Sequence, residues 1–384
     1  MKMSEHELLA WFQTNFPEYV KSLHSCTHHY ENNINPYHIE GDCWSHTLLV
    51  YKQVMNMHWK LTVPDGDYLE TYDYEVLLVS ALCHDLGKPL AKVIDEEQQK
   101  TKFHKHEQYS WLLSIPVVKK LVECDFLTKL QAEYVTKIVS LHSTLFDCLQ
   151  NDEFSKKLAI EKYKDDPILL NYVKFMSIAD AGGRFYLDNN KRGDFAIFED
   201  EIDECITSDE LYSKELTYYQ QNSLVLLVGL PCSGKDTFLK NMKEFDTYTV
   251  ISRDDILMKY GKDNGLGVEY SEIWNNLKEF DQEEIDRLLN EKFQDAARNC
   301  KDIVINMTNM SQKSRNRFTK NPLVKKYCKE AYVFLVDLET LKERNKQRYN
   351  STGKNIPESV FMLMTSRFKQ PMLSEFDSVH TIFG

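Results

Sequence analysis

A glycine-rich segment near the middle of the chain has the residue types and spacing that hold phosphate groups. Residues 229–235 read Gly-Leu-Pro-Cys-Ser-Gly-Lys and fit the frame G-x-x-x-x-G-K. An apolar run at 224–228 predicts a strand before it and a helical pattern follows, which is the context that this frame requires. Backbone N–H groups of such a loop close around phosphate oxygens, and Lys235 reaches the β- and γ-phosphates. The residues expected to bind ATP or another NTP are Gly229, Ser233, Gly234 and Lys235.

The position after Lys235 bears on the metal ion that accompanies a nucleotide. It holds Asp236 rather than the usual Ser or Thr, and Thr237 comes next. The hydroxyl that normally binds Mg²⁺ is therefore displaced by one residue. Three arrangements stay open: Thr237 binds Mg²⁺, Asp236 binds it, or water mediates the contact.

Two more groups of residues fit a transfer of phosphate. Ser252-Arg253-Asp254-Asp255 follows the next predicted strand, and the carboxyl ends of parallel strands face the ligand crevice. A carboxylate there, Asp254, can accept a proton from an attacking hydroxyl. Arg344 and Arg348 stand at i and i+4 of one helix, so their guanidinium groups can clamp transferring phosphates. A helix-capping Asp and a solvated basic face are the alternatives.

Together these residues resemble the kinase module of phage-type 5′-hydroxyl polynucleotide kinases, from about Leu224 to Leu373. The shared motifs are G-x-P-x-S-G-K, R-D-D, T-N at Thr308-Asn309, R-N-x-x-R at Arg344–Arg348 and I-P at Ile356-Pro357. The resemblance implies that Lys235 binds the donor phosphates and that Asp254 is the general base on the 5′-OH.

The resemblance also implies roles around the transferred group. Arg344 and Arg348 would stabilise the phosphoryl group, and Thr308 would contact the 3′-phosphate of the acceptor. We assign Arg253 to acceptor binding as well. Two positions depart from the pattern: Leu257 stands where the phage enzyme has an acceptor-binding Arg, and Met307 replaces the Asp before T-N.

The first half of the chain carries a different chemistry, because eleven of the twelve histidines lie at or before His142. His84-Asp85 closes an apolar helical pattern, with His46 upstream and His106 and Asp180 downstream. Imidazole and carboxylate ligands suit sites for Mn, Fe, Co, Ni or Zn. The histidines for which we expect an ordinary core or surface role are His6, His24, His28, His29 and His58.

These residues stand in three motifs that together resemble metal-dependent HD phosphohydrolases, over roughly Asn35–Arg184. The motifs are His38-x-Glu40-Gly-x-x-x-x-His46-Thr, Cys83-His84-Asp85-Leu-Gly-Lys88-Pro and Phe103-x-x-His106-Glu107, and Asp180-Ala-Gly-Gly-Arg184 completes the set. The resemblance implies one metal at His46, His84, Asp85 and Asp180, and a second toward Asp85, His106 and His142. Lys88 and Arg184 would meet substrate phosphate.

Two neighbouring choices in this half stay open at the level of sequence. His104 competes with His106, and we prefer His106 because Glu107 follows it as in the family and because a helical pattern starts there. His38 and Glu40 could border the pocket or form a structural turn.

Composition separates the two halves further. The 384 residues carry a formal charge of −12, but residues 1–216 hold a net −14 and residues 217–384 a net +2. The acidic total argues against a protein that coats nucleic acid, and we expect local binding of ends with a shallow salt dependence.

Nine scattered cysteines without a C-x-x-C indicate free thiols in a reducing cytoplasm, or the host cytoplasm if the protein is phage-encoded. No apolar run approaches the roughly 20 residues of a membrane span, and the first ten residues lack a signal pattern.

Periodicity predicts two domains, residues 1–216 and 217–384. The first is expected to be all-α, with helices over 7–16, 43–60, 73–83, 106–114, 130–142 and 166–179. The second alternates strands at 224–228, 248–251, 303–306 and 332–336 with helices at 236–243, 282–298, 311–318 and 341–349. Such alternation predicts an α/β domain with a parallel sheet.

The two resemblances combine in the HD-domain polynucleotide kinases, bifunctional enzymes that heal RNA ends. The first domain would remove a 2′,3′-cyclic or 2′/3′-terminal phosphate with one or two transition metals. The second would phosphorylate the 5′-OH of RNA, or of DNA, with ATP or another NTP and Mg²⁺. A separate RNA ligase is the expected partner, and no membrane is involved. The alternatives are an HD nucleotide hydrolase fused to a nucleoside or nucleotide kinase, which Leu257 slightly favours, and a non-catalytic RNA sensor.

Overall fold

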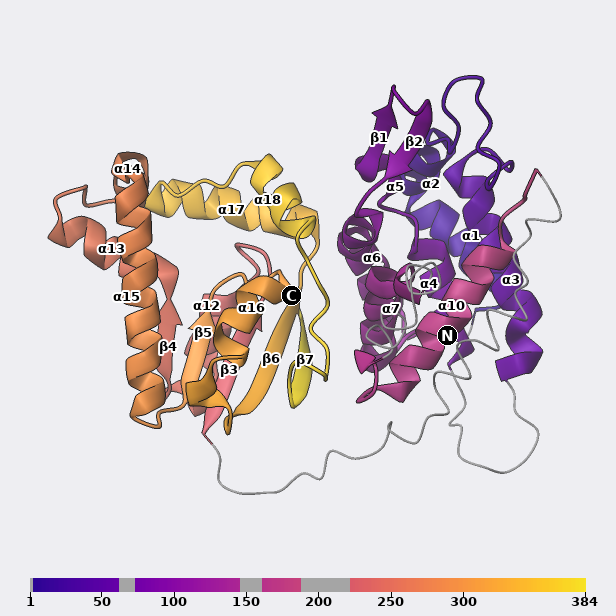
Figure 1. Cartoon of the computed structure of the whole chain (residues 1–384). Helices are drawn as coiled ribbons and strands as arrows, with labels where there is room; N and C mark the ends of the chain where they lie inside the picture. The colour runs from indigo at the N-terminus through magenta and orange to yellow at the C-terminus, as the bar shows by residue number, and fades with distance from the viewer. Residues whose placement is uncertain (1–2, 62–72, 146–160, 188–221) are drawn as a thin grey trace, which may run out of the picture. The chain divides into compact units, whose positions relative to one another are not determined.

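The computed structural model describes residues 3–61, 73–145, 161–187 and 222–384 (Figure 1). The chain forms two compact units, Met1–Lys214 and Glu215–Gly384. The domain boundary that we predicted at 216/217 lies outside the described residues. Among the helices in the described ranges, none is long and apolar enough to cross a membrane.

The described part of the first unit is built mainly from helices, as predicted. They are α1 (Glu5–Asn15), α2 (Pro17–His24), α3 (Cys43–Leu61), α4 (Tyr74–Cys83), α5 (Lys88–Ala91), α6 (His106–Glu123), α7 (Lys129–Leu141) and α10 (Pro167–Gly182). Every residue of α4 from Val76 to Cys83 is buried. A helix that is apolar on all sides occupies a core, and α4 contacts α3, α6, α7 and α10. The end of α4 therefore delivers His84 and Asp85 into the centre of the unit.

One element of the first unit was not predicted. Strands β1 (Lys92–Asp95) and β2 (Lys100–Phe103) pair as an antiparallel hairpin. Neither strand has a fully buried residue, so the hydrophobic alternation that marks a half-buried strand is missing from the sequence. The hairpin leads directly to His106 at the start of α6.

The second unit contains a five-stranded sheet, and the predicted parallel architecture is confirmed. Its strands are β3 (Ser223–Val228), β4 (Thr249–Ser252), β5 (Ile303–Asn306), β6 (Cys328–Leu335) and β7 (Ser378–Phe383). They are parallel and lie in the order β4-β5-β3-β6-β7. Strand β3 is central and almost wholly buried, which explains its continuous apolar run. The edge strand β7 was missed because none of its side chains is fully buried.

The helices of the second unit follow the strands. They are α12 (Lys235–Asn241), α13 (Arg253–Asp263), α14 (Tyr270–Asn276), α15 (Glu279–Arg298), α16 (Gln312–Thr319), α17 (Leu338–Thr352) and α18 (Glu358–Thr365). Because β4, β5 and β3 are neighbours, their carboxyl ends open side by side into α13, the 307–311 loop and the glycine-rich loop. That edge of the sheet is where a doubly wound fold places its ligand.

Candidate functional sites

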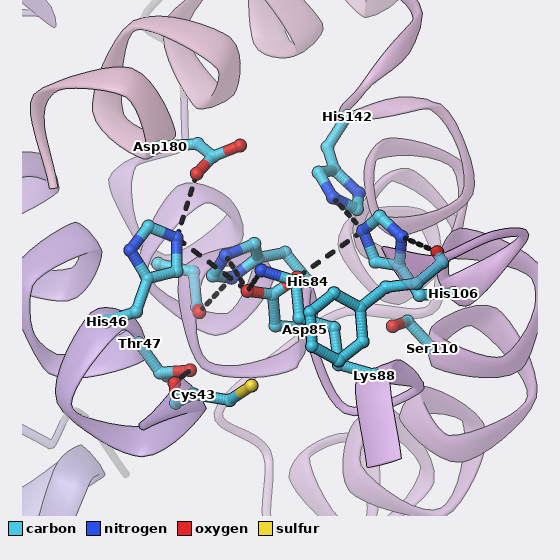
Figure 2. A network of polar contacts seen from close by, with 12 residues as sticks. Cys43, His46, Thr47, His84, Asp85, Lys88, His106, Ser110, His142 and Asp180 are labelled. Atoms are coloured by element: carbon cyan, nitrogen blue, oxygen red, sulfur yellow. Dashed lines mark hydrogen bonds and ion pairs between the residues drawn. The ribbon is translucent and has the colours of Figure 1, made fainter. Parts of the chain in front are cut away.

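Six side chains from five segments meet in the middle of the first unit (Figure 2). Their sources are α3 (His46), the residues directly after α4 (His84 and Asp85), the start of α6 (His106), the end of α7 (His142) and α10 (Asp180). All except His106 are buried. The structure therefore brings together the six residues that the sequence named as metal ligands.

Asp85 lies between two groups of possible ligands. Its Oδ2 is 3.2 Å from His84 Nε2 and 3.7 Å from His46 Nε2, while its Oδ1 is 3.4 Å from His106 Nε2. His46, His84 and Asp85 form one cluster, and Asp85, His106 and His142 form another. Asp180 joins the first cluster, since its Oδ1 is 2.9 Å from His46 Nε2. A carboxylate shared by two clusters is the arrangement that two metal ions need.

Backbone contacts fix the tautomers of three of these histidines. The Nδ1 atoms of His84, His106 and His142 lie 2.8 to 2.9 Å from the carbonyl oxygens of Ala81, Phe103 and Val139. A carbonyl oxygen only accepts, so each Nδ1 carries the proton and each Nε2 of the neutral ring presents a lone pair.

These lone pairs face other electron-rich atoms rather than donors. His106 Nε2 lies 3.2 Å from His142 Nε2, and the buried His84 Nε2 has no hydrogen-bond partner although it faces Asp85. Two lone pairs that face each other repel unless a proton or a metal ion lies between them. The donor set of imidazole and carboxylate groups therefore fits a transition metal such as Mn, Fe, Co, Ni or Zn.

The glycine-rich loop of the second unit is folded around the amine of Lys235. Lys235 Nζ donates to the carbonyl oxygens of Gly229 (3.0 Å) and Leu230 (2.7 Å) and to Ser233 Oγ (3.2 Å). Burial lowers the pKa of Lys235 to about 8. A Cβ at Gly229 would lie 2.8 Å from Ser233 Oγ, and Gly234 has φ +93°, so both positions need glycine.

A cavity of about 580 Å³ opens beside this loop. Its lining includes Lys235 and Thr237 from α12, Arg344 and Arg348 from α17, and the ring of Phe334. The volume lies in the range of small-molecule sites. Arg344 NH1 also lies 3.5 Å from the Cys232 carbonyl oxygen. The two arginines thus line the same cavity as the glycine-rich loop.

Asp236, one of the two candidates for binding Mg²⁺ at this loop, contacts a side chain of the neighbouring strand. Asp236 Oδ1 accepts a hydrogen bond from Asn306 Nδ2 (2.7 Å), which holds the carboxylate at the end of β5. Asp236 and Thr237 are both exposed. A Mg²⁺ ion that keeps several waters could be held by either residue.

Comparisons with known proteins agree with the two sites. Residues 43–181 match the model of the HD domain and residues 224–371 that of the AAA domain. The first unit thus matches an HD domain and the second an AAA domain. The HD match spans the segment from α3 to Asp180, and the AAA match spans the glycine-rich loop and both arginines.

A curated relative is the "Putative bifunctional polynucleotide kinase/RNA ligase" of Autographa californica nuclear polyhedrosis virus. It is 31% identical over 140 residues, which cover 36% of this chain and 20% of that protein. The match thus covers only a fifth of the length of the curated relative.

Two solved structures are also similar. The structure of the Pnkp1/Rnl/Hen1 RNA repair complex contains a chain 24% identical, with a TM-score of 0.32 and coverage of 40% of this chain and 46% of that one. A putative kinase from Chloroflexus aurantiacus is 15% identical, with a TM-score of 0.33 and coverage of 43% and 87%. At these TM-scores neither similarity defines the fold of the whole chain.

Two cations of the HD domain lie against its carboxylates. Lys88 Nζ is 2.7 Å from Asp85 Oδ2, and Arg184 NH2 is 3.0 Å from Asp180 Oδ2. Burial raises the pKa of both carboxyls, but neighbouring positive groups outweigh it. His84 and Lys88 hold the pKa of Asp85 well below its usual range. Arg184 and His46 do the same for Asp180. Both residues expected to meet substrate phosphate therefore border the predicted metal ligands.

His28, for which the sequence predicted an ordinary core or surface role, lies at this site. His28 is buried, its Nε2 lies 3.0 Å from Lys88 Nζ, and its ring stacks on His38 with centroids 4.1 Å apart. Burial and the nearby Lys88 lower the pKa of His28, so the neutral ring accepts from the lysine. His28 therefore helps to aim Lys88, and no spacing in the sequence signals this because 60 residues separate the two.

The sequence left two roles open for Glu40, at the border of the pocket or in a structural turn, and in the structure its carboxylate contacts the metal-ligand candidate His46. Its Oε1 is 3.2 Å from His46 Nδ1 and 2.7 Å from His38 Nδ1, and its Oε2 accepts from the backbone N–H of Phe185. Burial raises the pKa of Glu40, but contacts with His38 and His46 outweigh it, and the net shift is downward. A carboxylate behind a histidine ligand fixes the tautomer and orientation of that ligand. His104, the rival of His106, is exposed in a turn before α6.

Three residues discussed for the acceptor side of the AAA domain make contacts within the domain. Arg253 faces α15, where it donates to Gln282 Oε1 and pairs with Asp286. The Thr308 carbonyl oxygen accepts from the Gly229 N–H (3.0 Å), which fastens the phosphate loop. Leu257 is fully buried against Ile273. The acceptor-binding roles expected of Arg253 and Thr308 stay predictions.

Asp254, in the first turn of α13, is the candidate general base. Ser252 Oγ caps α13 by accepting from the Asp255 N–H, so Asp254 is not the helix cap that the sequence allowed as an alternative. Its side chain is 57% exposed and contacts Lys354 and Tyr270. A carboxylate at this strand end is positioned to accept a proton from a bound hydroxyl.

Proposed function

We propose that this chain heals broken RNA ends. The HD domain would remove a 2′,3′-cyclic or a 2′/3′-terminal phosphate, and the AAA-type domain would phosphorylate a 5′-OH end with ATP or another NTP. The observation that supports the proposal is that one chain carries both a buried histidine and carboxylate centre and an open glycine-rich loop. A strand break with a 3′ phosphate and a 5′-OH needs both reactions before a ligase can join it.

In the HD domain, some of the buried polar side chains would coordinate metal and others would bind substrate. The six ligand candidates would hold one or two metal ions, which would polarise a phosphoryl oxygen and lower the pKa of a bound water. Lys88 and Arg184 bind the non-bridging phosphate oxygens and neutralise their charge. Glu40 keeps the Nδ1 proton of His46 in place, so that Nε2 faces the centre.

In the AAA-type domain the residues fit an in-line phosphoryl transfer. Asp254 accepts the proton of the 5′-OH as the O5′–Pγ bond forms and the bond from Pγ to the β,γ-bridging oxygen breaks, which releases the nucleoside diphosphate. Lys235 moves from the loop carbonyls to the donor phosphates, and Arg344 and Arg348 stabilise the charge of the transferring group. Asp236 or Thr237 supports Mg²⁺.

The name of the viral relative, which joins a polynucleotide kinase with an RNA ligase, supports polynucleotide ends as the substrate. A ligase, supplied as a separate protein, would consume the healed ends. The proposal includes DNA ends, because a 5′-OH and the phosphate next to it occur in both RNA and DNA.

The test is a single incubation of wild-type protein with a short RNA that carries a 5′-OH and a 2′,3′-cyclic phosphate, with ATP, Mg²⁺ and one of the five transition metals. We expect the 5′ end to gain phosphate and the cyclic phosphate to open and leave. A chain that changes neither end would refute the proposal.

The second candidate, an HD nucleotide hydrolase fused to a nucleoside or nucleotide kinase, shares both sets of motifs, and Leu257 slightly favours it. Leu257 is buried in one hydrophobic cluster with Ile273, so packing gives a reason for a leucine at this position that does not depend on the acceptor. Nucleosides and mononucleotides tested beside the RNA separate the two candidates.

A further inference from the structure

A basic and aromatic cluster lies directly against Asp254 in the second unit. We propose that Lys354, Tyr270 and Trp274 form the acceptor-strand subsite of the kinase domain. Lys354 would bind the phosphate on the 3′ side of the terminal nucleoside, and Trp274 would stack on a base of a single strand. This inference rests on the proposed kinase function and names the part of the substrate that the domain selects.

Lys354 is positioned for this role by the end of α17. Gly353 ends that helix with φ +67°, so the chain reverses after it. Asn345 then holds the returning segment by donating to the carbonyl oxygen of Ile356 (2.9 Å) and accepting from its N–H (3.2 Å). The segment carries Lys354 to Asp254, with Nζ 2.5 Å from Oδ2.

The surroundings of Lys354 are unusual for a surface lysine. Its side chain is only 15% exposed, and Nζ lies 3.6 Å from the centroid of the Tyr270 ring, which adds a cation–π contact. The Tyr270 hydroxyl donates to Asp254 Oδ1 (3.2 Å). Lys354 is thus held at the carboxylate that the proposed mechanism assigns to the 5′-OH, at about the reach of the next phosphate.

Trp274 extends the cluster away from Asp254. It stands one helical turn after Tyr270 on α14, and the two rings are nearly parallel, with an interplanar angle of 9°. Trp274 is 48% exposed, which leaves much of the indole open to a ligand. Exposed aromatic rings beside a cation are the common means of binding single-stranded nucleic acid.

The cluster also explains how the domain could manage without the missing arginine. Leu257 is buried, and Arg253 is engaged by α15. Lys354 instead supplies a positive charge beside Asp254 from a different element. While the Lys354–Asp254 pair persists, it occupies one oxygen of the base, and an acceptor phosphate would draw the lysine away from it.

The test measures kcat and KM for three acceptors: a 5′-OH oligonucleotide, a nucleoside 3′-monophosphate and a nucleoside. We expect Lys354→Met to raise the KM of both phosphate-bearing acceptors roughly tenfold and to leave the KM of the nucleoside and of ATP unchanged. Lys354→Arg should restore most of the difference. Trp274→Ala should raise the KM of the oligonucleotide alone by roughly tenfold, as expected for one stacked base. Lys259→Met, an exposed lysine on α13, is the matched control.

Equal effects of Lys354→Met on all three acceptors would overturn the inference, because they would indicate only a structural role in orienting Asp254. An unchanged KM for the oligonucleotide would overturn it as well. Both outcomes leave the proposed function intact if the wild type phosphorylates the oligonucleotide. A wild type that phosphorylates only the nucleoside would instead refute the proposed function.

Discussion

The two sites of this chain are built in opposite ways. In the HD domain, His46, His84 and Asp85 are at most 1% exposed, and three of the histidines are fixed through Nδ1 by backbone carbonyls. In the AAA-type domain, the Asp254 side chain is 57% exposed, and Lys235 donates to carbonyl oxygens of its own loop. The ligand candidates of the HD centre are thus held by backbone contacts, whereas in the proposed reaction Lys235 would exchange its loop contacts for contacts with the donor phosphates.

This difference follows from the ligands that each site takes. Metal coordination tolerates deviations of only about 0.2 Å, so its ligands need fixed rotamers and supporting contacts. A nucleotide and a strand end are large and flexible, and their phosphates can draw Lys235 and Lys354 out of the pairs that they form here. The HD centre should therefore respond to substitution through metal affinity, and the kinase site through KM and kcat.

The largest effect is expected at the carboxylate shared by the two clusters. Asp85→Asn removes the negative charge that both metal positions need, so we expect bound metal to fall below one ion per chain and phosphate release to fall on the order of 10³-fold, since a bound metal supplies several kcal/mol of stabilisation. Elemental analysis and a hydrolysis assay measure these. Asp95→Asn, an ion-paired aspartate of the β1 strand, is the control, and full metal content in Asp85→Asn would contradict the assignment.

The next effect concerns the phosphate loop. Lys235→Met removes the charge that reaches the donor phosphates, and kcat/KM for the 5′ phosphorylation should fall about 10²- to 10³-fold, as for loss of one preorganised charge at a developing anion. Lys240→Met, an exposed residue of the same helix α12, should behave as wild type. Phosphorylation at the wild-type rate in Lys235→Met would show that this loop does not bind the donor.

A smaller effect sharpens the view of the HD centre as preorganised. Glu40→Gln keeps a hydrogen-bond acceptor but loses the charge behind His46, and loss of such a supporting group typically weakens metal affinity 10- to 100-fold. Titration of the chelator-treated protein with Mn²⁺ measures the change. Glu31→Gln, at an exposed position, is the matched control. Equal affinity in wild type and Glu40→Gln would mean that Glu40 serves only the local turn.

The smallest effect is a pH dependence of donor binding. Because burial lowers the pKa of Lys235 to about 8, the amine of the nucleotide-free protein loses its proton as the pH rises through that value. Binding must then restore the proton, so NTP affinity should fall above pH 8, by at most about tenfold per pH unit. Calorimetry with a non-hydrolysable ATP analogue between pH 7 and 9.5 measures this fall and the proton uptake. An affinity that rises with pH would contradict the account.

The sequence predicted both folds, and its short, locally spaced motifs named the six metal-ligand candidates that the structure brings together. Lys235 is marked by its glycines, and His84-Asp85 by its position at the end of an apolar helix. The sequence did not predict His28, or the cluster around Lys354. Lys354 lies 100 residues from Asp254 along the chain, so only the tertiary fold brings them together. The strands β1, β2 and β7 escaped prediction since their exposure removes the alternating pattern.

The central claim is that one chain carries two independent sites, one that removes phosphate and one that adds it. The most direct test treats one RNA with a 5′-OH and a 2′,3′-cyclic phosphate with Asp85→Asn and with Lys235→Met, and measures both ends. We predict that Asp85→Asn still phosphorylates the 5′ end but retains the cyclic phosphate, and that Lys235→Met does the reverse. Loss of both reactions in either folded variant, or of neither in both, would contradict the claim.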